Sequence, residues 1–392
     1  MSIVLAVIGA IGCAIWIVQA LLLGGHLSRL RLVAETDVSR SAPWPRVSVV
    51  VPARDEVSSI EAALTSRLAD DYPALDIVVI DDRSTDGTSE AIARVAGRDK
   101  RVSCTRVDSV PDGWLGKVHA LSVGVASAGG DWLLISDADV HIAPGGLRRA
   151  IAYCERETLD FLALVPEFRS RSLAVDVAWA VFMRILGTFV DPGKVRDPRS
   201  PVSMGSGGFM LVRRAAYERT PGYGHLRMET ADDVGLGLMM KGSGARCDFA
   251  NGLGIASIEI YDSAGSFFRG IEKNAGSLVA LRLPVVIALI GFAGLVEFSG
   301  LIGVSSGLWW GVAAGTVALV AATASTVAAL HANTRRILPA LLWPVGWLLV
   351  ATGIVRAAWL LAYRGGVVWR DTFYSREQLH EGRRITLPRE PD

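Results

Sequence analysis

Long segments without charge constrain this chain more than any other feature of its sequence. Residues Ser2–Gly25 contain no charged side chain, residues Leu283–Leu330 contain only Glu297, and residues Ile337–Val355 contain none. A helix needs about 20 apolar residues to cross a bilayer. The first segment therefore predicts one membrane span, the second predicts two, and the third predicts one more.

The flanks of the first segment predict its orientation. The segment has no basic region in front of it and no A-x-A site behind it, so we interpret residues 1–26 as a retained anchor rather than a signal peptide. Its positive flank, Arg29 and Arg31, follows the apolar stretch. Because basic flanks stay in the cytoplasm, we expect the next segment to be cytoplasmic.

Residues 45–275 have the composition of a soluble domain. Strand and helix signals alternate along them, which predicts an α/β fold with a mostly parallel sheet covered by helices. The strand signals are Val47–Glu56, Asp76–Ile80, Val102–Val107 and Trp132–Ser136, and the helix signals are Ser58–Leu68, Thr88–Val95 and Lys117–Ser127.

Acidic residues follow three of the four predicted strands. They are Asp55 with Glu56, Asp81 with Asp82, and Asp137 with Asp139. Adjacent carboxylates repel one another, so a buried strand gains nothing from them. Ligands of parallel α/β sheets bind beyond the carboxyl ends of the strands. The sequence therefore predicts a binding site at this edge of the sheet.

Two motifs in this region have the chemistry to bind a diphosphate. Ser136–Val140 has the sequence S-D-A-D-V, and two carboxylates two residues apart can hold Mg²⁺ or Mn²⁺. A simple turn stabilised by an Asp side chain is the alternative. Lys117 follows a glycine-containing loop at a predicted helix start, where its ammonium and free backbone N–H groups can meet an anion. A solvated lysine is the alternative there.

Two later motifs favour an acceptor site. Asp232 and Asp233 lie near the start of the predicted helix Glu229–Met240, where a carboxylate either caps the helix or acts as a general base toward a hydroxyl. The glycine-rich segment Met204–Arg214 lacks the G-x-G-x-x-G dinucleotide fingerprint. We interpret it as a tight loop that lets a bulky acceptor approach the backbone, at Gly205, Ser206, Gly207 and Gly208.

The motifs V-P-A-R-D-E, D-D-R-S-T-D-G-T, D-A-D, G-S-G-G-F and A-D-D occur in this order between Val47 and Asn274. Together they resemble the family 2 glycosyltransferases of GT-A fold, and D-D-x-S-x-D-G-T is the most specific of them. The apolar segments and the sequence G-W-L-G-K are similar to membrane members that glycosylate lipids, namely the ceramide glucosyltransferase-like, hopanoid-associated and carotenoid-glycosylating enzymes. The resemblance implies a hexosyltransferase in a bacterial inner membrane, with its catalytic domain in the cytoplasm.

The resemblance also implies roles for individual residues. A UDP- or GDP-linked sugar would be bound by Pro52, Asp55, Glu56, Asp82, Lys117, Asp137 and Arg269. Within this set Lys117 would meet the diphosphate. Asp139 would bind the metal, Mg²⁺ or Mn²⁺, and Asp233 would be the general base, with Asp232 in the place of the usual Glu.

One base opposite the leaving group implies a single displacement with inversion, and the expected reaction is transfer of one sugar to a lipid hydroxyl. The acceptor would be a hopanoid, a ceramide, a carotenoid or another isoprenoid-like lipid. A polysaccharide synthase is one alternative, but only Arg269 remains of the Q-x-x-R-W motif that holds a growing chain, because Ser266 and Gly270 replace the Gln and the Trp. A catalytically silent membrane scaffold is the other alternative. The net charge of +1 gives no field for nucleic acid.

The C-terminal part of the sequence contains a conflict. Residues 283–363 predict a membrane domain of two to three spans, and three crossings would place the basic tail, residues 364–392, outside. Basic tails favour the cytoplasm. The tail also resembles the W-R-x-x-x-Y tail of ceramide glucosyltransferase-like enzymes, with Trp369 and Tyr374 at the matching positions. We therefore expect a cytoplasmic C-terminus.

Two interpretations follow for the apolar helices. Leu283–Val304 is the expected non-crossing segment, because it contains Glu297 and several glycines, and Arg356 is the expected partner of Glu297. Leu173–Val190 contains few charges and several aromatic residues. It is either a core helix or a helix that lies in the membrane interface.

Overall fold

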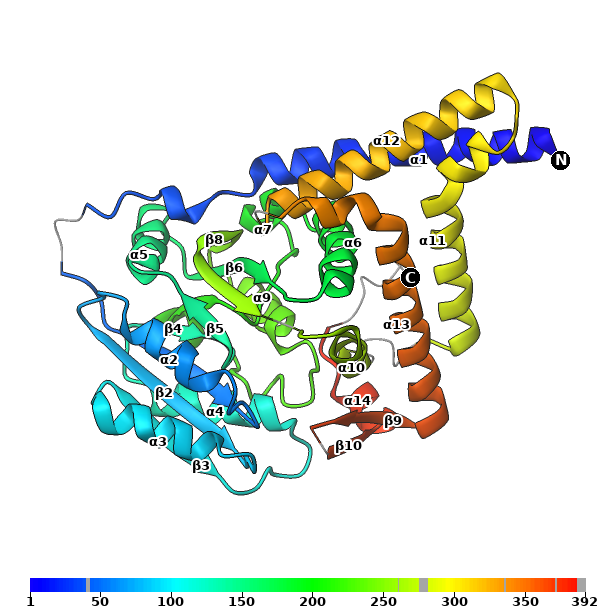
Figure 1. Cartoon of the computed structure of the whole chain (residues 1–392). Helices are drawn as coiled ribbons and strands as arrows, with labels where there is room; N and C mark the ends of the chain where they lie inside the picture. Colours follow the sequence, from blue (N-terminus) through cyan, green and yellow to red (C-terminus); the bar gives the residue numbers. More distant parts are fainter. Residues whose placement is uncertain (40–42, 260, 275–280, 335, 371, 386–392) are drawn as a thin grey trace. The chain divides into compact units, whose positions relative to one another are not determined.

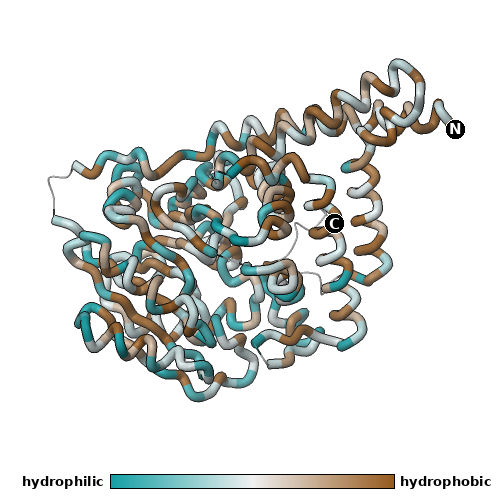
Figure 2. The backbone as a smooth tube through the Cα atoms, viewed as in Figure 1, coloured by the Kyte–Doolittle hydropathy of each residue, from teal (hydrophilic) through white to brown (hydrophobic). Residues whose placement is uncertain are grey.

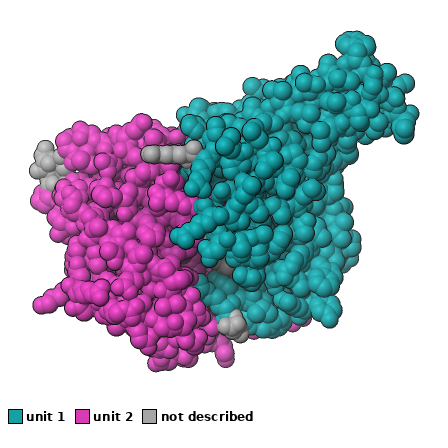
Figure 3. All heavy atoms as spheres, in the orientation of Figure 1, with its two compact units in different colours: residues 1–29, 170–191, 261–376 teal, residues 30–169, 192–260, 377–392 magenta. Residues whose placement is uncertain are grey.

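The computed structural model describes residues 1–39, 43–259, 261–274, 281–334, 336–370 and 372–385 (Figure 1). The chain divides into two compact units (Figure 3). The first contains Met1–Arg29, Ser170–Asp191 and Tyr261–Arg376, and the second contains Leu30–Arg169, Pro192–Ile260 and Glu377–Asp392. These units differ from the contiguous domains expected from the sequence, because packing rather than chain order decides which segments belong together.

The second unit is built on an eight-stranded sheet of order β3-β2-β1-β4-β7-β6-β8-β5. Its strands are β1 (Val47–Ala53), β2 (Leu75–Asp82), β3 (Val102–Val107), β4 (Trp132–Ile135), β5 (Val140–Ile142), β6 (Phe161–Arg169), β7 (Met210–Arg213) and β8 (Cys247–Glu259). Strands β3, β2, β1 and β4 are parallel, whereas β7 is antiparallel to both of its neighbours. The predicted α/β fold with a mostly parallel sheet is confirmed.

Helices cover this sheet (Figure 1). They are α2 (Ile60–Leu68), α3 (Thr88–Arg98), α4 (Gly116–Ser127), α5 (Gly146–Arg156), α7 (Pro192–Arg196), α8 (Arg214–Tyr217) and α9 (Asp232–Gly242), with a 3-10 turn at Val33–Glu35. A further short helix, α14 (Arg376–Gly382), lies in the C-terminal tail. Strand β1 buries residues on both faces, as expected of a central parallel strand. Its register pairs Ala53 with Asp81, so the loops that follow β1 and β2 begin side by side.

The first unit contains the apolar helices. Its elements are α1 (Ser2–Arg29), α6 (Leu173–Phe189), α10 (Ala264–Asn274), α11 (Leu283–Val304), α12 (Trp309–His331), a 3-10 turn (Leu338–Leu342), α13 (Trp343–Arg364), β9 (Gly366–Trp369) and β10 (Thr372–Ser375). Four helical segments are long and apolar enough to cross a membrane: Ser2–Arg29, Leu283–Val304, Trp309–His331 and Leu338–Arg364. Figure 2 shows their predominantly hydrophobic residues.

Helices α1, α11 and α12 approach one another at glycines. A Cβ atom at Gly9 would lie 2.5 Å from the Cα of Gly303, and one at Gly315 would lie 2.5 Å from the carbonyl oxygen of Gly300. Small residues allow this close contact, which is a common way for membrane helices to pack. The glycines of Leu283–Val304 therefore do not break the helix, which is continuous, and two of them, Gly300 and Gly303, lie in its packing surface.

The expected pairing of Glu297 with Arg356 is wrong. Glu297 instead accepts two hydrogen bonds from Arg184 Nη2 of α6, both 2.8 Å long. Arg356 pairs with Glu272 of α10 at 2.9 Å, and Arg364 pairs with the same carboxylate at 2.6 Å. An apolar environment requires the buried carboxylate to have a nearby partner, and α6 supplies it.

Candidate active site

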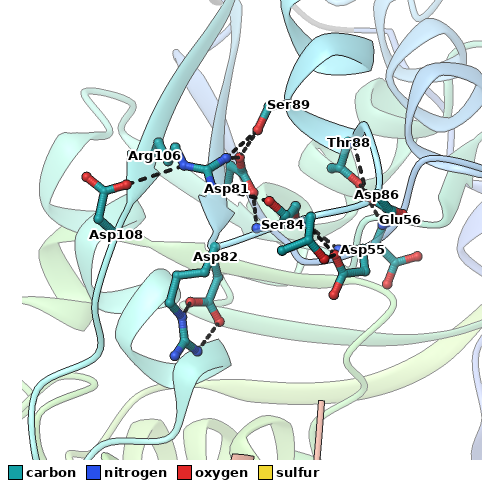
Figure 4. A network of polar contacts seen from close by, with 12 residues as sticks. Asp55, Glu56, Asp81, Asp82, Ser84, Asp86, Thr88, Ser89, Arg106 and Asp108 are labelled. Atoms are coloured by element: carbon teal, nitrogen blue, oxygen red, sulfur yellow. Dashed lines mark hydrogen bonds and ion pairs between the residues drawn. The ribbon is translucent and has the colours of Figure 1, made fainter. Parts of the chain in front are cut away.

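Asp81 and Asp82, at the end of β2, have different surroundings (Figure 4). Asp81 is fully buried and accepts hydrogen bonds from Ser84 N (3.0 Å) and from the Ser89 hydroxyl, and its Oδ2 lies 2.8 Å from Arg106 Nη1. Burial acts to raise the pKa of Asp81, but these hydrogen bonds and the arginine outweigh it and lower the pKa. Asp81 therefore fixes the shape of the loop.

The loop after β1 is joined to the loop after β2 (Figure 4). Asp55 Oδ1 accepts a hydrogen bond from Thr85 N (2.8 Å), and Asp55 N donates one to Ser84 Oγ (3.1 Å). Glu56 N donates to Thr88 Oγ1 at 2.8 Å. Asp55 adopts a left-handed conformation with φ of 54°, which Asp tolerates better than most residues. These contacts hold the two predicted nucleotide-binding acids on one rigid edge.

Two arginines that the sequence analysis missed lie at Asp82. Arg83 donates from Nε to Oδ1 (2.8 Å) and from Nη2 to Oδ2 (3.3 Å), and Arg54 Nη1 lies 4.0 Å from Oδ2. A Cβ atom at Gly116 would come within 2.5 Å of Asp82 Oδ2, so Asp82 lies against the start of α4. A ligand that reached Asp82 would share this carboxylate with Arg83. The available signal in the sequence was Arg83, the basic residue directly after the pair Asp81-Asp82.

Lys117, the second residue of α4, connects the D-A-D turn to the start of α9. Its Nζ lies 2.9 Å from Asp137 Oδ1 and 3.3 Å from Asp232 Oδ2. Burial alone would lower the pKa of Lys117, but attraction to Asp137, Asp232 and Asp233 outweighs it and raises the pKa. Lys117 is therefore a fixed positive charge at the point where the predicted phosphate-binding and base residues meet.

Asp137 and Asp139 occupy the turn between β4 and β5. Burial, together with the carboxylates of Asp137 and Glu56, raises the pKa of Asp139 to about 7. A divalent cation would relieve this repulsion, so the donors fit Mg²⁺ or Mn²⁺. Among the described residues, no group of three His, Cys, Asp or Glu side chains could hold a metal by itself. This suits a cation that keeps water and phosphate oxygens as its other ligands.

A buried arginine supports the D-A-D turn, and the sequence analysis missed it. Arg67 is fully buried and donates from Nη2 to the Ser136 hydroxyl (3.2 Å) and to the Asp137 carbonyl. Burial lowers its pKa to about 10. Arg67 follows Ile60 and Leu64 at helical spacing on the buried face of α2, and that spacing was the available signal.

The glycine-rich loop lies between the D-A-D turn and α9. Gly207 N donates to Asp233 Oδ2 (3.0 Å), and Asp137 N donates to Gly207 O (3.1 Å). A Cβ atom at Gly205 would lie 1.8 Å from Asp233 O, so no side chain fits there. Close packing within the protein therefore explains why the loop contains glycine at this position. The role of the loop toward an acceptor stays a prediction.

The two acids at the start of α9 differ in access. Asp232 is 3% exposed and is paired with Lys117, whereas Asp233 is partly exposed. Asp233 Oδ1 accepts a hydrogen bond from Val234 N (2.8 Å). Of the two, Asp233 is therefore better placed to take a proton from a ligand.

The remaining predicted residues lie elsewhere. Pro52 is in β1, beside Ile80 of β2. Arg269 lies on α10 in the first unit, and its role at the diphosphate stays a prediction. The structure therefore brings together the acids at the strand ends, Lys117, the glycine-rich loop and Asp233, all within the second unit.

Comparisons with known proteins show similarity to glycosyltransferases. Residues 48–220 match the family described as glycosyl transferase family 2. The beta-monoglucosyldiacylglycerol synthase of Synechocystis is 28% identical over 159 residues, which is 38% of this chain and 33% of that protein. The 4,4'-diaponeurosporenoate glycosyltransferase of Staphylococcus aureus is 37% identical over 97 residues, which is 24% of each chain. The matched regions thus span a third or less of these relatives' length.

A solved structure extends the likeness over most of the chain. It is the mannosyltransferase PcManGT from Pyrobaculum calidifontis, in complex with GDP-Man and Mn²⁺. The TM-score is 0.54 at 21% sequence identity, with 92% of this chain and 99% of that chain covered. At this identity the likeness concerns the fold. Residues 48–220 are therefore similar to the family 2 glycosyltransferases, and the chain has the GT-A fold.

Proposed function

We propose that this protein is a membrane-anchored, inverting glycosyltransferase that moves one sugar from a nucleoside diphosphate sugar to a lipid hydroxyl. The observation that carries the proposal is the position of Lys117 between Asp137 and Asp232, with Asp233 beside the glycine-rich loop. This arrangement supports a charge for the leaving diphosphate and a base for the acceptor in one site. The four apolar helices and the lipid-related names of two relatives favour a lipid acceptor over a soluble one.

In the proposed reaction, Asp233 accepts the proton of the acceptor hydroxyl as the oxygen attacks the anomeric carbon. The new carbon–oxygen bond forms opposite the bond to the diphosphate, which breaks, so the configuration inverts. Lys117 exchanges part of its pairing with Asp137 and Asp232 for phosphate oxygens and stabilises the departing charge. A cation at Asp139 and Asp137 would supply further positive charge to the diphosphate.

The base and ribose would lie at the joined loops after β1 and β2, near Asp55, Glu56 and Asp82. A UDP- or GDP-linked donor fits this set, because carboxylates can accept hydrogen bonds from either base and from ribose hydroxyls. We place the catalytic domain on the cytoplasmic side of a bacterial inner membrane, since the basic residues Arg29 and Arg31 follow the anchor.

The test is a binding and hydrolysis panel with the purified full-length protein. UDP- and GDP-sugars are added with and without Mn²⁺, and the thermal midpoint and donor hydrolysis are recorded. A true donor stabilises the folded state by mass action and raises the midpoint. Lys117→Met should abolish the shift, whereas Lys100→Met, at an exposed lysine, should keep it. Absence of any shift or hydrolysis across the panel would refute the proposal.

A further inference from the structure

The C-terminal tail binds to the catalytic unit at a buried carboxylate. The described tail residues 377–385 belong to the second unit, which contains the candidate active site and is called the catalytic unit below, although they follow the last apolar helix. Glu229 is 4% exposed, and its Oε2 accepts hydrogen bonds from the backbone N–H groups of Arg384 (2.8 Å) and Ile385 (3.0 Å). Two successive backbone donors on one carboxylate oxygen form a charge-assisted attachment that does not depend on tail side chains.

Packing reinforces this attachment. A Cβ atom at Gly382 would lie 2.1 Å from the Cβ of Met228, so the tail backbone lies directly against the residue before Glu229. Leu379, on α14, is 3% exposed. The tail therefore packs closely against Met228, and its Leu379 side chain is withdrawn from solvent.

The segment that receives the tail leads into α9. Glu229 Oε1 accepts a long hydrogen bond of 3.4 Å from Ala231 N, at the residue that precedes Asp232 and Asp233. On the other side, Arg227 O accepts a hydrogen bond of 2.7 Å from Leu115 N, two residues before Lys117. Residues 227–231 thus connect the tail to the loop before Lys117 and to helix α9, which carries Asp233.

We propose that the C-terminal tail acts as a strap that holds helix α9 in place. Glu229 is the positioning residue through which the tail acts. This inference rests on the proposed function of Asp233 as base. Without the strap, residues 227–231 lose the support at Glu229, and the position of Asp233 relative to the acceptor becomes less defined.

The test uses full-length protein in detergent with two substitutions that release the tail by different means. Gly382→Ala introduces the clash with Met228, and Glu229→Ala removes the acceptor of both tail amides. The matched controls are Gly97→Ala, where no atom lies within 4 Å of the added Cβ, and Glu218→Ala, at an exposed glutamate of the same unit. Glu229→Gln retains an acceptor oxygen and should restore part of the attachment.

We expect hydrogen exchange at the Arg384 and Ile385 amides to rise in both release variants. The turnover number should fall about tenfold to a hundredfold, the scale of a misplacement of about 1 Å, while donor affinity changes less than about twofold. Glu229→Gln should lie between the wild type and Glu229→Ala, and both controls should match the wild type. Normal turnover with freely exchanging tail amides would overturn the proposal, as would a tail that stays protected in both variants.

A second readout separates this proposal from the proposed function. If the wild-type protein shows no transfer with any donor, the glycosyltransferase proposal fails, but exchange at the α9 amides of Val234 and Gly235 can still be measured. Faster exchange there on tail release would support the strap. Unchanged exchange at α9 in both release variants would refute it.

Discussion

The ion pair between Arg184 and Glu297 offers a sharp test of how the apolar helices are held together. Arg184 Nη2 lies 2.8 Å from both carboxylate oxygens of Glu297, and the two residues are only 2% and 7% exposed. The Arg184 guanidinium carbon also lies 4.6 Å from the ring centre of Trp16, whose Nε1 donates to Val296 O. Three helices, α1, α6 and α11, therefore meet at one charge pair.

Removing one partner leaves the other charge buried without compensation. We expect Arg184→Met or Glu297→Leu to destabilise the protein by about 3–5 kcal/mol, the range for a broken buried pair. Part of the Arg184→Met effect is the lost contact with Trp16, which is worth roughly 0.5–2 kcal/mol. The double variant Arg184→Met/Glu297→Leu leaves no charge to desolvate, so its stability should return to within about 1 kcal/mol of wild type.

The assay is denaturant unfolding in detergent, followed by tryptophan fluorescence, for a complete double-mutant cycle. An exposed pair serves as control: Glu61 Oε2 lies 3.0 Å from Arg94 Nη2, and both side chains are more than a third exposed. Glu61→Gln should change stability by less than about 1 kcal/mol. Single variants of the buried pair that cost no more than this control, or a double variant as unstable as the sum of the singles, would refute the reasoning.

Three further predictions concern the site and the tail. Asp233→Asn should bind donor normally but lower turnover by about 10²-fold or more, the scale of general-base catalysis; near-normal turnover would move the role to Asp232. The raised pKa of Asp139, about 7, disfavours its ionised form in the folded state, so the metal-free protein should lose stability as pH rises from about 4 toward 7. The melting midpoint of the metal-free protein should fall over this pH range, and both Asp139→Asn and added Mn²⁺ should reduce the fall. A melting midpoint of the wild type that does not change with pH would contradict the raised pKa of Asp139. A cysteine introduced at Ser375, with the native cysteines replaced, should resist membrane-impermeant maleimide in intact cells, whereas labelling would place the tail outside.

The position of the site was predictable because strand ends are set by local pattern. The third strand, Val102–Val107, has the predicted bounds, and the acids that follow the apolar runs of β1, β2 and β4 do lie at one edge. Strand β8 was missed, because Asn251, Gly252 and Gly254 interrupt its apolar pattern. The structure accommodates the interruption with a register shift against β6, between Pro166 and Glu167.

Partners that are distant in sequence could not be predicted in the same way. Arg356 was the expected partner of Glu297 because both lie in the C-terminal spans, but the observed partner lies 113 residues before it. That partner is on α6, whose amphipathic pattern could not distinguish a core helix from an interfacial one. Val177, Ala180 and Val181 of α6 are buried, whereas Phe189 is 80% exposed. The tail attachment could not be predicted from the sequence either, because its donors are backbone N–H groups, which every residue except proline has.

The tail attachment limits how many C-terminal helices can cross the membrane. The catalytic unit begins at Leu30, directly after α1, and it also contains the tail from Glu377. If α11, α12 and α13 all crossed, the tail and the catalytic unit would lie on opposite sides. The hydrogen bonds from Arg384 and Ile385 to Glu229 require the same side. If these helices cross a membrane, we therefore expect an even number of crossings between β8 and the tail.

The contacts of α13 show where it lies along the other apolar helices. Trp343, its first residue, donates from Nε1 to Thr323 Oγ1 (3.1 Å) and lies 6.1 Å from Trp16 between ring centres. Both contacts are well inside α12 and α1, far from the ends of those helices, so α13 begins partway along the helix group. It ends near Glu272, which pairs with Arg364, and Arg376 donates to Leu281 O just before α11 begins. Trp343 also stacks on Phe298 of α11, with 6.2 Å between ring centres, so α13 runs beside α11 from Phe298 back to the start of that helix. The contacts of α13 therefore do not set it apart from α11, and the assignment of Leu283–Val304 as the segment that stays on one side stays a prediction.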